Sequence, residues 1–166
     1  MKNKNIIPVF FAVDDGYIPF LAVSLKSVID NASEENEYKI KILYTNVSEE
    51  NMVKIKNYKS QNIDIEFVDV KKQLEAIKDK LYTRNYFSNT TYYRLFLAEM
   101  FPEYEKALYI DSDTVVLGDI SELFDYDIGD NYVGASCDPV VSQADIFGNY
   151  AEQVLDIDRN HYFNAG

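Results

Sequence analysis

Two aspartates separated by one residue, Asp111 and Asp113, follow directly after the short apolar run Ala107 to Ile110. Residues i and i+2 of an extended segment project to the same side, so both carboxylates can face one ion. Carboxylate oxygens are hard ligands that suit Mg²⁺ or Mn²⁺. The D-x-D spacing therefore predicts a divalent-metal site through which an acidic protein could hold a phosphorylated ligand.

The composition narrows the classes of function. The chain has 166 residues, with 16 basic against 28 acidic side chains and a formal net charge of −12. A chain this acidic repels polyanions, so we expect no nucleic-acid partner. One cysteine, Cys137, excludes an internal disulfide, and one histidine, His161, excludes a histidine-rich metal site. Neither G-x-x-x-x-G-K-[ST] nor G-x-G-x-x-G occurs, so the usual glycine-rich phosphate loops are missing.

No apolar run approaches the roughly 20 residues that span a bilayer, so we expect no transmembrane segment. The basic N-terminus is followed only by the short apolar run Ile6 to Val13, which meets Asp14 and Asp15 without a small-residue cleavage pattern. This argues against a signal peptide and predicts a cytoplasmic location. The length suits one domain.

The elements that must position the aspartates alternate between strand and helix. Such an order predicts an α/β fold, with a mainly parallel sheet flanked by helices on both faces. Strands are expected at Ile6 to Val13, Tyr38 to Tyr44, Ile63 to Phe67 and Ala107 to Ile110, with further candidates at Val115 to Leu117 and Tyr132 to Ala135. Helices are expected from Pro19 to about Asn31, from the N-cap Ser48 to about Tyr58, from Lys71 to Leu81 and from Tyr92 to Glu99.

Ligands of parallel α/β sheets bind beyond the carboxyl ends of the strands. Asp14 and Asp15 follow the first predicted strand, and the Asp111 to Asp113 segment follows a later one. If those two strands lie near one another, both acidic clusters face one crevice.

The residues themselves leave several interpretations of Asp111 and Asp113 open. The first interpretation is a turn with two solvated aspartates. A helix-loop-helix calcium site is excluded, because Val115 and Val116 stand where a ligand and a glycine are needed. A haloacid-dehalogenase-type phosphotransferase fits locally, with Asp111 as nucleophile and Asp113 as general acid/base. That motif usually lies near the start of its domain, whereas 110 residues precede it here. The last interpretation is a nucleotide-sugar-binding D-x-D motif, which binds a diphosphate through a metal.

A resemblance separates these alternatives. The sequence resembles the N-terminal part of glycosyltransferase family 8, the retaining glucosyl- and galactosyltransferases that include lipopolysaccharide enzymes and are similar to glycogenin. Six matching stretches occur in order along nearly the whole chain: Phe11 to Tyr17, Ser24 to Val28, Thr90 to Leu95, Ala107 to Asp113, Asp130 to Ala135 and Tyr162 to Gly166.

The resemblance implies a GT-A fold, with residues 1–166 as a nucleotide-sugar-binding domain. It implies that Ala12, Asp14 and Tyr17 contact the uridine, with Tyr17 stacked on the base, and that Ser112 lies near the ribose. Gly16 stands where several family members have Asn.

The same resemblance implies the catalytic and metal residues. Asp111 and Asp113 match the metal-binding pair, for Mn²⁺ or Mg²⁺, and Arg94 matches an arginine near the donor sugar and its phosphates. Asn164 matches a donor-sugar contact, and Asp138 lies where family members contact the acceptor. Asp111, Asp113 and Arg94 are therefore the expected catalytic residues.

The implied reaction moves a hexose from UDP-glucose or UDP-galactose to a hydroxyl of a saccharide acceptor with retention of configuration, as in lipopolysaccharide biosynthesis. The family continues well past the Phe163-Asn164-Ala165-Gly166 motif, so we expect a domain truncated at its C-terminal side. The missing segment would supply a histidine metal ligand and could attach the protein peripherally to a membrane. A haloacid-dehalogenase-like phosphatase and a non-catalytic UDP-sugar-binding fragment are the alternatives, and the oligomeric state stays open.

Overall fold

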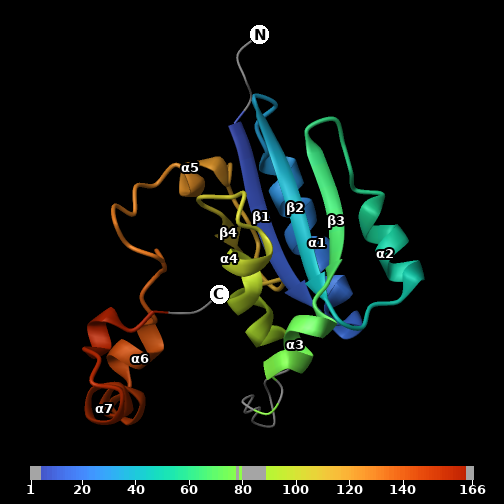
Figure 1. Ribbon diagram of the computed structural model, residues 1–166. Coiled ribbons are helices and arrows are strands. Elements are labelled where there is room, and N and C mark those ends of the chain that lie inside the picture. Colours follow the sequence, from blue (N-terminus) through green and yellow to red (C-terminus); the bar gives the residue numbers. More distant parts are fainter. Residues whose placement is uncertain (1–4, 78, 80–88, 164–166) are drawn as a thin grey trace. The chain divides into compact units, whose positions relative to one another are not determined.

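A computed structural model describes residues 5–77, 79 and 89–163 of the chain (Figure 1). These residues form two compact units. The first unit runs to Tyr126 and contains the sheet, and the second begins at Asp127 and contains short helices joined by irregular segments.

The sheet of the first unit has four strands in the order β3-β2-β1-β4. All three neighbouring pairs are parallel, which confirms the predicted mainly parallel α/β sheet. The strands are β1 (Asn5–Val13), β2 (Asn36–Tyr44), β3 (Ile63–Asp69) and β4 (Leu108–Tyr109).

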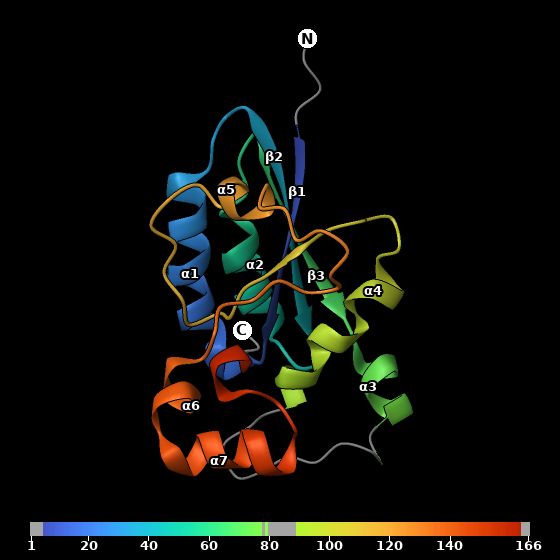
Figure 2. The same cartoon turned by 90° about the vertical axis from the view of Figure 1, so that its left-hand side faces the viewer.

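Helices cover both faces of this sheet, as Figure 2 shows. One face carries α1 (Ile18–Asn31) and α2 (Glu49–Lys56). The other carries α3 (Lys71–Ile77), a 3₁₀ segment at Asn89–Phe96 and α4 (Leu97–Met100). Two separate apolar clusters fill the two interfaces, so the sheet is buried on both sides.

Strand β1 is apolar almost throughout because it serves both clusters. Ile7, Val9 and Phe11 pack in the cluster of α1 and α2, whereas Phe10 and Ala12 pack in the opposite one. A parallel strand that is buried on both faces has this continuous apolar pattern.

Local signals in the sequence account for the starts of the first two helices. Pro19 lies in the first turn of α1, where its missing N–H costs nothing. The Ser48 side chain caps α2 by accepting the Asn51 N–H, as expected. The ends are less well predicted, because α2 stops at Lys56 rather than near Tyr58.

The helix predicted over Tyr92 to Glu99 is mostly a 3₁₀ segment, and only Leu97–Met100 is α-helical. Helix α3 ends at Ile77, and the rest of its predicted range, up to Leu81, lies almost wholly outside the described residues.

The strand expected at Val115 to Leu117 does not form. Its backbone groups bind side chains of α1 instead: the Val116 N–H donates to Ser27 Oγ at 2.9 Å, and the Val116 carbonyl accepts Asn31 Nδ2 at 3.1 Å. These bonds replace a sheet ladder. The chain then continues into α5 (Ser121–Phe124).

The second unit contains α6 (Pro139–Gln143), α7 (Asp145–Val154) and a 3₁₀ turn at Arg159–His161. The strand expected at Tyr132 to Ala135 is wrong as well. Within the described part of this unit, the β pairing is limited to one isolated bridge between Cys137 and Phe163, which leaves no ladder for it to join.

The Arg159 side chain ties the 3₁₀ turn of the second unit to α7. It donates to both carboxylate oxygens of Glu152, at 2.9 and 3.0 Å, to Asp145 Oδ1 at 3.2 Å and to Asn149 Oδ1 at 3.0 Å. A Cβ at Gly148 would lie only 2.4 Å from Arg159 Cζ, so a side chain there would displace the guanidinium from its present position. In the part of the chain that the structure describes, no helix is both long and apolar enough to cross a membrane.

Candidate functional site

The two acidic clusters directly follow two adjacent strands of the sheet. Strands β1 and β4 pair in parallel, and the Ile110 N–H extends the ladder by donating to the Phe10 carbonyl at 3.0 Å. Asp14 directly follows β1, and Asp111 directly follows Ile110. Both clusters therefore lie at the carboxyl edge of the sheet, where ligands of such folds bind.

Asp14 and Tyr17 form one side of this site. Asp14 is extended, with φ −108° and ψ 177°, and its Oδ1 accepts the Tyr17 N–H at 3.1 Å. The Tyr17 side chain is 46% exposed and its ring lies 5.3 Å from that of Phe20, centroid to centroid. Ala12 is buried at the end of β1. An exposed ring beside a carboxylate can bind a flat heterocycle that carries an N–H donor.

Asp15, the second aspartate of this cluster, has a structural role that the sequence did not indicate. Its Oδ1 accepts the Ser48 N–H at 2.8 Å and Asn51 Nδ2 at 3.0 Å, which ties the end of β1 to the start of α2. These hydrogen bonds, that of the Ser48 backbone first, hold the pKa of Asp15 below its usual value. In the sequence, the N-cap motif marked Ser48 as the start of a helix, but it did not indicate that Asp15 would bind there.

The segment from Asp111 to Thr114 is a hydrogen-bonded turn. Thr114 Oγ1 donates to the Asp111 carbonyl at 2.8 Å, and the Thr114 N–H points to the same oxygen at 3.3 Å. Thr114 Oγ1 also lies 3.3 Å from Ser24 Oγ of α1, which is fully buried. Ser112 is buried and Asp113 is exposed. The turn replaces the extended geometry assumed from the spacing, and a shared orientation of the two carboxylates toward one ion stays a prediction.

Arg94 of the 3₁₀ segment lies next to this turn. Its Nη2 lies 3.4 Å from Asp111 Oδ1, across 17 positions of sequence. The guanidinium stacks over the Tyr109 ring at 4.3 Å, and Nε donates to the Thr91 carbonyl at 3.1 Å. Tertiary structure thus brings together two predicted catalytic residues, Arg94 and Asp111.

Tyr109 supports this arrangement without acting as a base. Burial raises the pKa of the Tyr109 phenol to about 12, with Asp111 and Asp113 adding to the shift and Arg94 opposing it. The phenol therefore stays protonated at neutral pH and serves as a platform for the guanidinium. The sequence signal for this role was an aromatic residue two positions before the D-x-D motif.

The remaining predicted residues belong to the second unit. Asp138 caps α6, because its Oδ1 accepts the N–H groups of Val140 at 2.8 Å and Val141 at 3.1 Å. Its own N–H donates to the Tyr162 carbonyl at 2.8 Å, so the predicted acceptor residue lies beside the first residue of the last motif. Asn164 lies outside the described residues.

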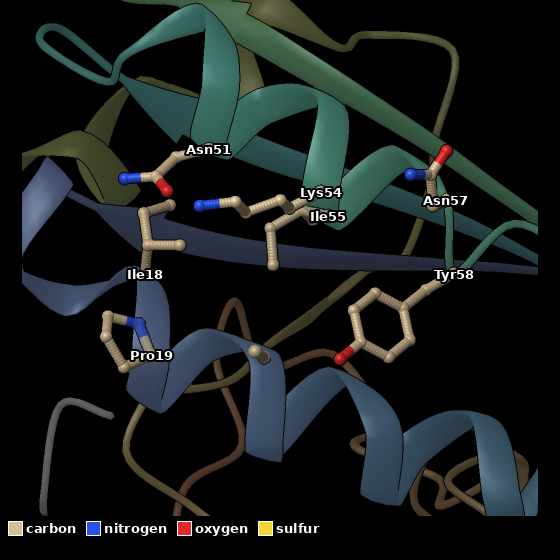
Figure 3. A pocket seen from close by; sticks show the side chains of 8 residues that line it. Ile18, Pro19, Asn51, Lys54, Ile55, Asn57 and Tyr58 are labelled. Carbon is tan, nitrogen blue, oxygen red and sulfur yellow. The ribbon is translucent and has the colours of Figure 1, made fainter.

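A groove of about 620 Å³ lies between α1 and α2 (Figure 3). Ile18 and Ile55 point into the space between the two helices, and Lys54 lies along it. The predicted site residues do not line this groove, because it opens between the helices of one sheet face and not beyond the strand ends.

The donor set fits a divalent ion only in part. Asp111 and Asp113 supply hard carboxylate oxygens on one turn, and Arg94 supplies a cation for phosphate oxygens. Among the residues that the structure describes, no group of three or more His, Cys, Asp or Glu side chains comes together to hold a metal. The pair can anchor an ion whose other ligands come from a bound diphosphate or from elsewhere.

Solved structures define the class. The chain superposes on the apo structure of the bifunctional glycosyltransferase WbbM with a TM-score of 0.85 and 32% identity, covering 100% of this chain and 31% of that one. It superposes on the galactosyltransferase LgtC, solved with donor and acceptor sugar analogs, with a TM-score of 0.77 and 32% identity, covering 96% of this chain and 56% of that one. The fold is therefore of the GT-A glycosyltransferase type.

Sequence comparison gives the family. The pattern of glycosyl transferase family 8 matches residues 8–166, so the chain belongs to that family. A Haemophilus influenzae protein that is named as a glycosyltransferase is 31% identical over 99% of this chain and 47% of its own length. General stress protein A of Bacillus subtilis is 25% identical over 100% of this chain and 56% of its own length. The chain thus spans about half of these relatives.

Family membership favours the glycosyltransferase over the phosphatase as the interpretation of the D-x-D motif. Asp111 is then not required as the nucleophile of a phosphatase.

Proposed function

We propose that this chain is the donor-binding part of a retaining hexosyltransferase and binds UDP-glucose or UDP-galactose. The observation that carries the proposal is the pairing of β1 with β4, which puts the Asp14–Tyr17 cluster and the Asp111–Asp113 turn at one edge of the sheet. A nucleoside diphosphate needs both kinds of contact, one for its base and one for its phosphates. The likeness to LgtC, which was crystallised with donor and acceptor sugar analogs, supports this choice of ligand.

The nucleoside would bind at the end of β1. The half-exposed Tyr17 ring offers a stacking surface for uracil. The Asp14 carboxylate can accept the uracil N3–H while its Oδ1 also receives the Tyr17 N–H. Ala12 and Ser112 come from the two paired strand ends, where the ribose would lie.

The diphosphate would bind at the end of β4. Asp111 and Asp113 would hold Mn²⁺ or Mg²⁺, which when bound supplies Lewis-acid stabilisation of the negative charge on the leaving diphosphate. Arg94, already seated beside Asp111, would donate to phosphate oxygens and add positive charge at the same place.

Asn164 is proposed for the donor sugar and Asp138 for a saccharide acceptor. The Asp138 N–H donates to the Tyr162 carbonyl, so Asp138 lies beside Tyr162 within the second unit. We expect the choice of acceptor to depend also on the part of the relatives' length that this chain does not span.

Calorimetry of UDP with and without Mn²⁺ tests the proposal. We expect UDP binding that requires the metal and that Asp113→Ala weakens strongly, since even outer-shell partners of metal ligands are worth roughly 10- to 100-fold. Asp125→Ala is the matched control, because Asp125 is also an exposed aspartate of the first unit. UDP affinity that is the same without metal, or the same in Asp113→Ala, would refute the proposed site.

A non-catalytic UDP-sugar-binding module is the second candidate, because the chain spans only about half the length of its relatives. Hydrolysis of UDP-glucose and UDP-galactose on the same sample separates the two. Metal-dependent binding without any hydrolysis supports the binding module, and metal-dependent release of hexose supports the enzyme.

A further inference from the structure

The hydrogen bonding of Arg94 is incomplete in one specific respect. The side chain as a whole is only 19% exposed, and its Nη1 is buried. This nitrogen has no hydrogen-bond partner among the described residues. A buried guanidinium nitrogen without an acceptor is costly, so native structures usually supply one. The missing acceptor points to a ligand oxygen.

The pairing of Arg94 with Asp111 is also loose. The Nη2 to Oδ1 separation of 3.4 Å is longer than the roughly 2.7–2.9 Å of a strong charge-assisted hydrogen bond. The guanidinium is held in place by other groups, namely the Tyr109 ring at 4.3 Å and the Thr91 carbonyl at 3.1 Å. Its position therefore does not depend on Asp111, and it can exchange one acceptor for another without moving far.

Arg94 is also the one basic side chain in an ion pair with the D-x-D turn among the described residues. It partly neutralises Asp111, which is the charge that a divalent ion would otherwise neutralise. A metal and a guanidinium that share one carboxylate repel each other, unless an anion arrives to bind them both.

We propose that Arg94 is the counter-ion of Asp111 in the absence of metal, and that it changes partner to the diphosphate when a divalent ion takes Asp111. The proposal rests on the function proposed above and assigns Arg94 a second role within it. One consequence is thermodynamic: Arg94 opposes binding of the metal alone and favours the metal together with the nucleotide. The two ligands should therefore bind with positive coupling that depends on this side chain.

Titrations of Mn²⁺ alone, and of UDP at saturating Mn²⁺, test this with the full chain. In Arg94→Gln we expect Mn²⁺ alone to bind about two- to fivefold tighter, the value of one partly exposed ion pair. We expect UDP to bind at least roughly tenfold more weakly, because charge-assisted bonds to phosphate are lost. These opposite changes in one variant cannot come from partial unfolding, which would weaken both.

Two further variants sharpen the experiment. Lys106→Gln makes the same change in net charge and also removes a cation stacked on an aromatic ring, since Lys106 lies 4.8 Å from the Phe124 ring centroid. It should leave both affinities unchanged. Arg94→Lys keeps the charge but loses the planar fork, so it should bind Mn²⁺ alone nearly as the wild type does and recover only part of the UDP affinity.

The outcomes are distinguishable. If the wild-type chain binds UDP with Mn²⁺ but Arg94→Gln binds Mn²⁺ alone no more tightly, the counter-ion role is overturned and the proposed function stands. If the wild-type chain does not bind Mn²⁺ and UDP at all, the proposed function itself is refuted and the role of Arg94 falls with it.

Discussion

A buried tyrosine connects the sheet to the segment that follows the D-x-D turn. The effect of removing its hydroxyl on stability can be estimated from the structure. Tyr38 of β2 is fully buried. Its hydroxyl donates to Asp119 Oδ1 at 2.6 Å and accepts the Ser33 N–H at 3.0 Å. Asp119 in turn accepts the Ser121 N–H at 3.0 Å, at the start of α5. Tyr38→Phe deletes the hydroxyl and keeps the ring.

The expected cost is about 1–2 kcal/mol of unfolding free energy. A hydrogen bond to a charged group contributes roughly 1.5–3 kcal/mol, and leaving the Ser33 N–H without its partner adds to the loss. The figure is reduced because Asp119 is partly exposed and keeps its bond to Ser121. For a chain of this length, such a loss lowers the Tm by roughly 2–8 °C.

The pH dependence gives a second, independent expectation. Burial opposes ionisation of Asp119, but the hydrogen bonds from Tyr38 and Ser121 outweigh it and hold the pKa of Asp119 below its usual 3.8. Stability that comes from a lowered carboxyl pKa is present above pH 3.8 and is lost as the pH falls through the folded-state pKa. The gap between wild type and Tyr38→Phe should therefore be full at neutral pH and shrink below pH 3.8.

Urea unfolding at pH about 7 and about 3 measures this. Tyr44→Phe is the control, since Tyr44 lies on the same strand, its ring packs against Phe67 and its hydroxyl has no hydrogen bond among the described residues. If Tyr38→Phe costs no more than Tyr44→Phe, or costs the same at both pH values, then the bond to an ionised Asp119 does not stabilise the fold.

Two further predictions follow from contacts on either unit. Phe20→Ala removes the ring that packs against Tyr17, so in calorimetry UDP affinity should fall about three- to tenfold. The Mn²⁺-dependent affinity for pyrophosphate should stay the same. An equal loss for both ligands would contradict a role of these rings in binding the base. Gly148→Ala puts a methyl group 2.4 Å from Arg159 Cζ and should lower the thermal midpoint of unfolding. Gly118→Ala is the control and should not lower it, because a Cβ there meets nothing within 4 Å. Equal midpoints in the two variants would show that the Arg159 contacts are dispensable.

Much of the first unit could be predicted from short-range patterns. The buried strand β1, the proline in the first turn of α1 and the Ser48 cap of α2 were all visible in the sequence, and the structure confirms them. Each depends on side-chain periodicity or on a cap within three residues, which are interactions that neighbours in sequence determine.

The errors occurred where a distant segment competes for the backbone. Val115 to Leu117 has the composition of a strand, but side chains of α1 more than 80 positions away bind its N–H and carbonyl groups. The range from Tyr92 to Phe96 has helical spacing, yet it adopts the tighter 3₁₀ form with Tyr93 buried against the sheet. Local propensity carries no information about such partners.

By itself, the sequence determined the residue types of the site: two aspartates after an apolar strand, an aspartate and a tyrosine after another, and an arginine between them. The tertiary structure decided their roles. It made Asp15 a hydrogen-bond acceptor for the start of α2. It also made the D-x-D segment a turn, which Thr114 closes while it lies next to Ser24 of α1. It also seated Arg94 on Tyr109 beside Asp111. The physical reason is that residue chemistry is encoded one position at a time, whereas charge pairing and burial depend on which strands lie side by side.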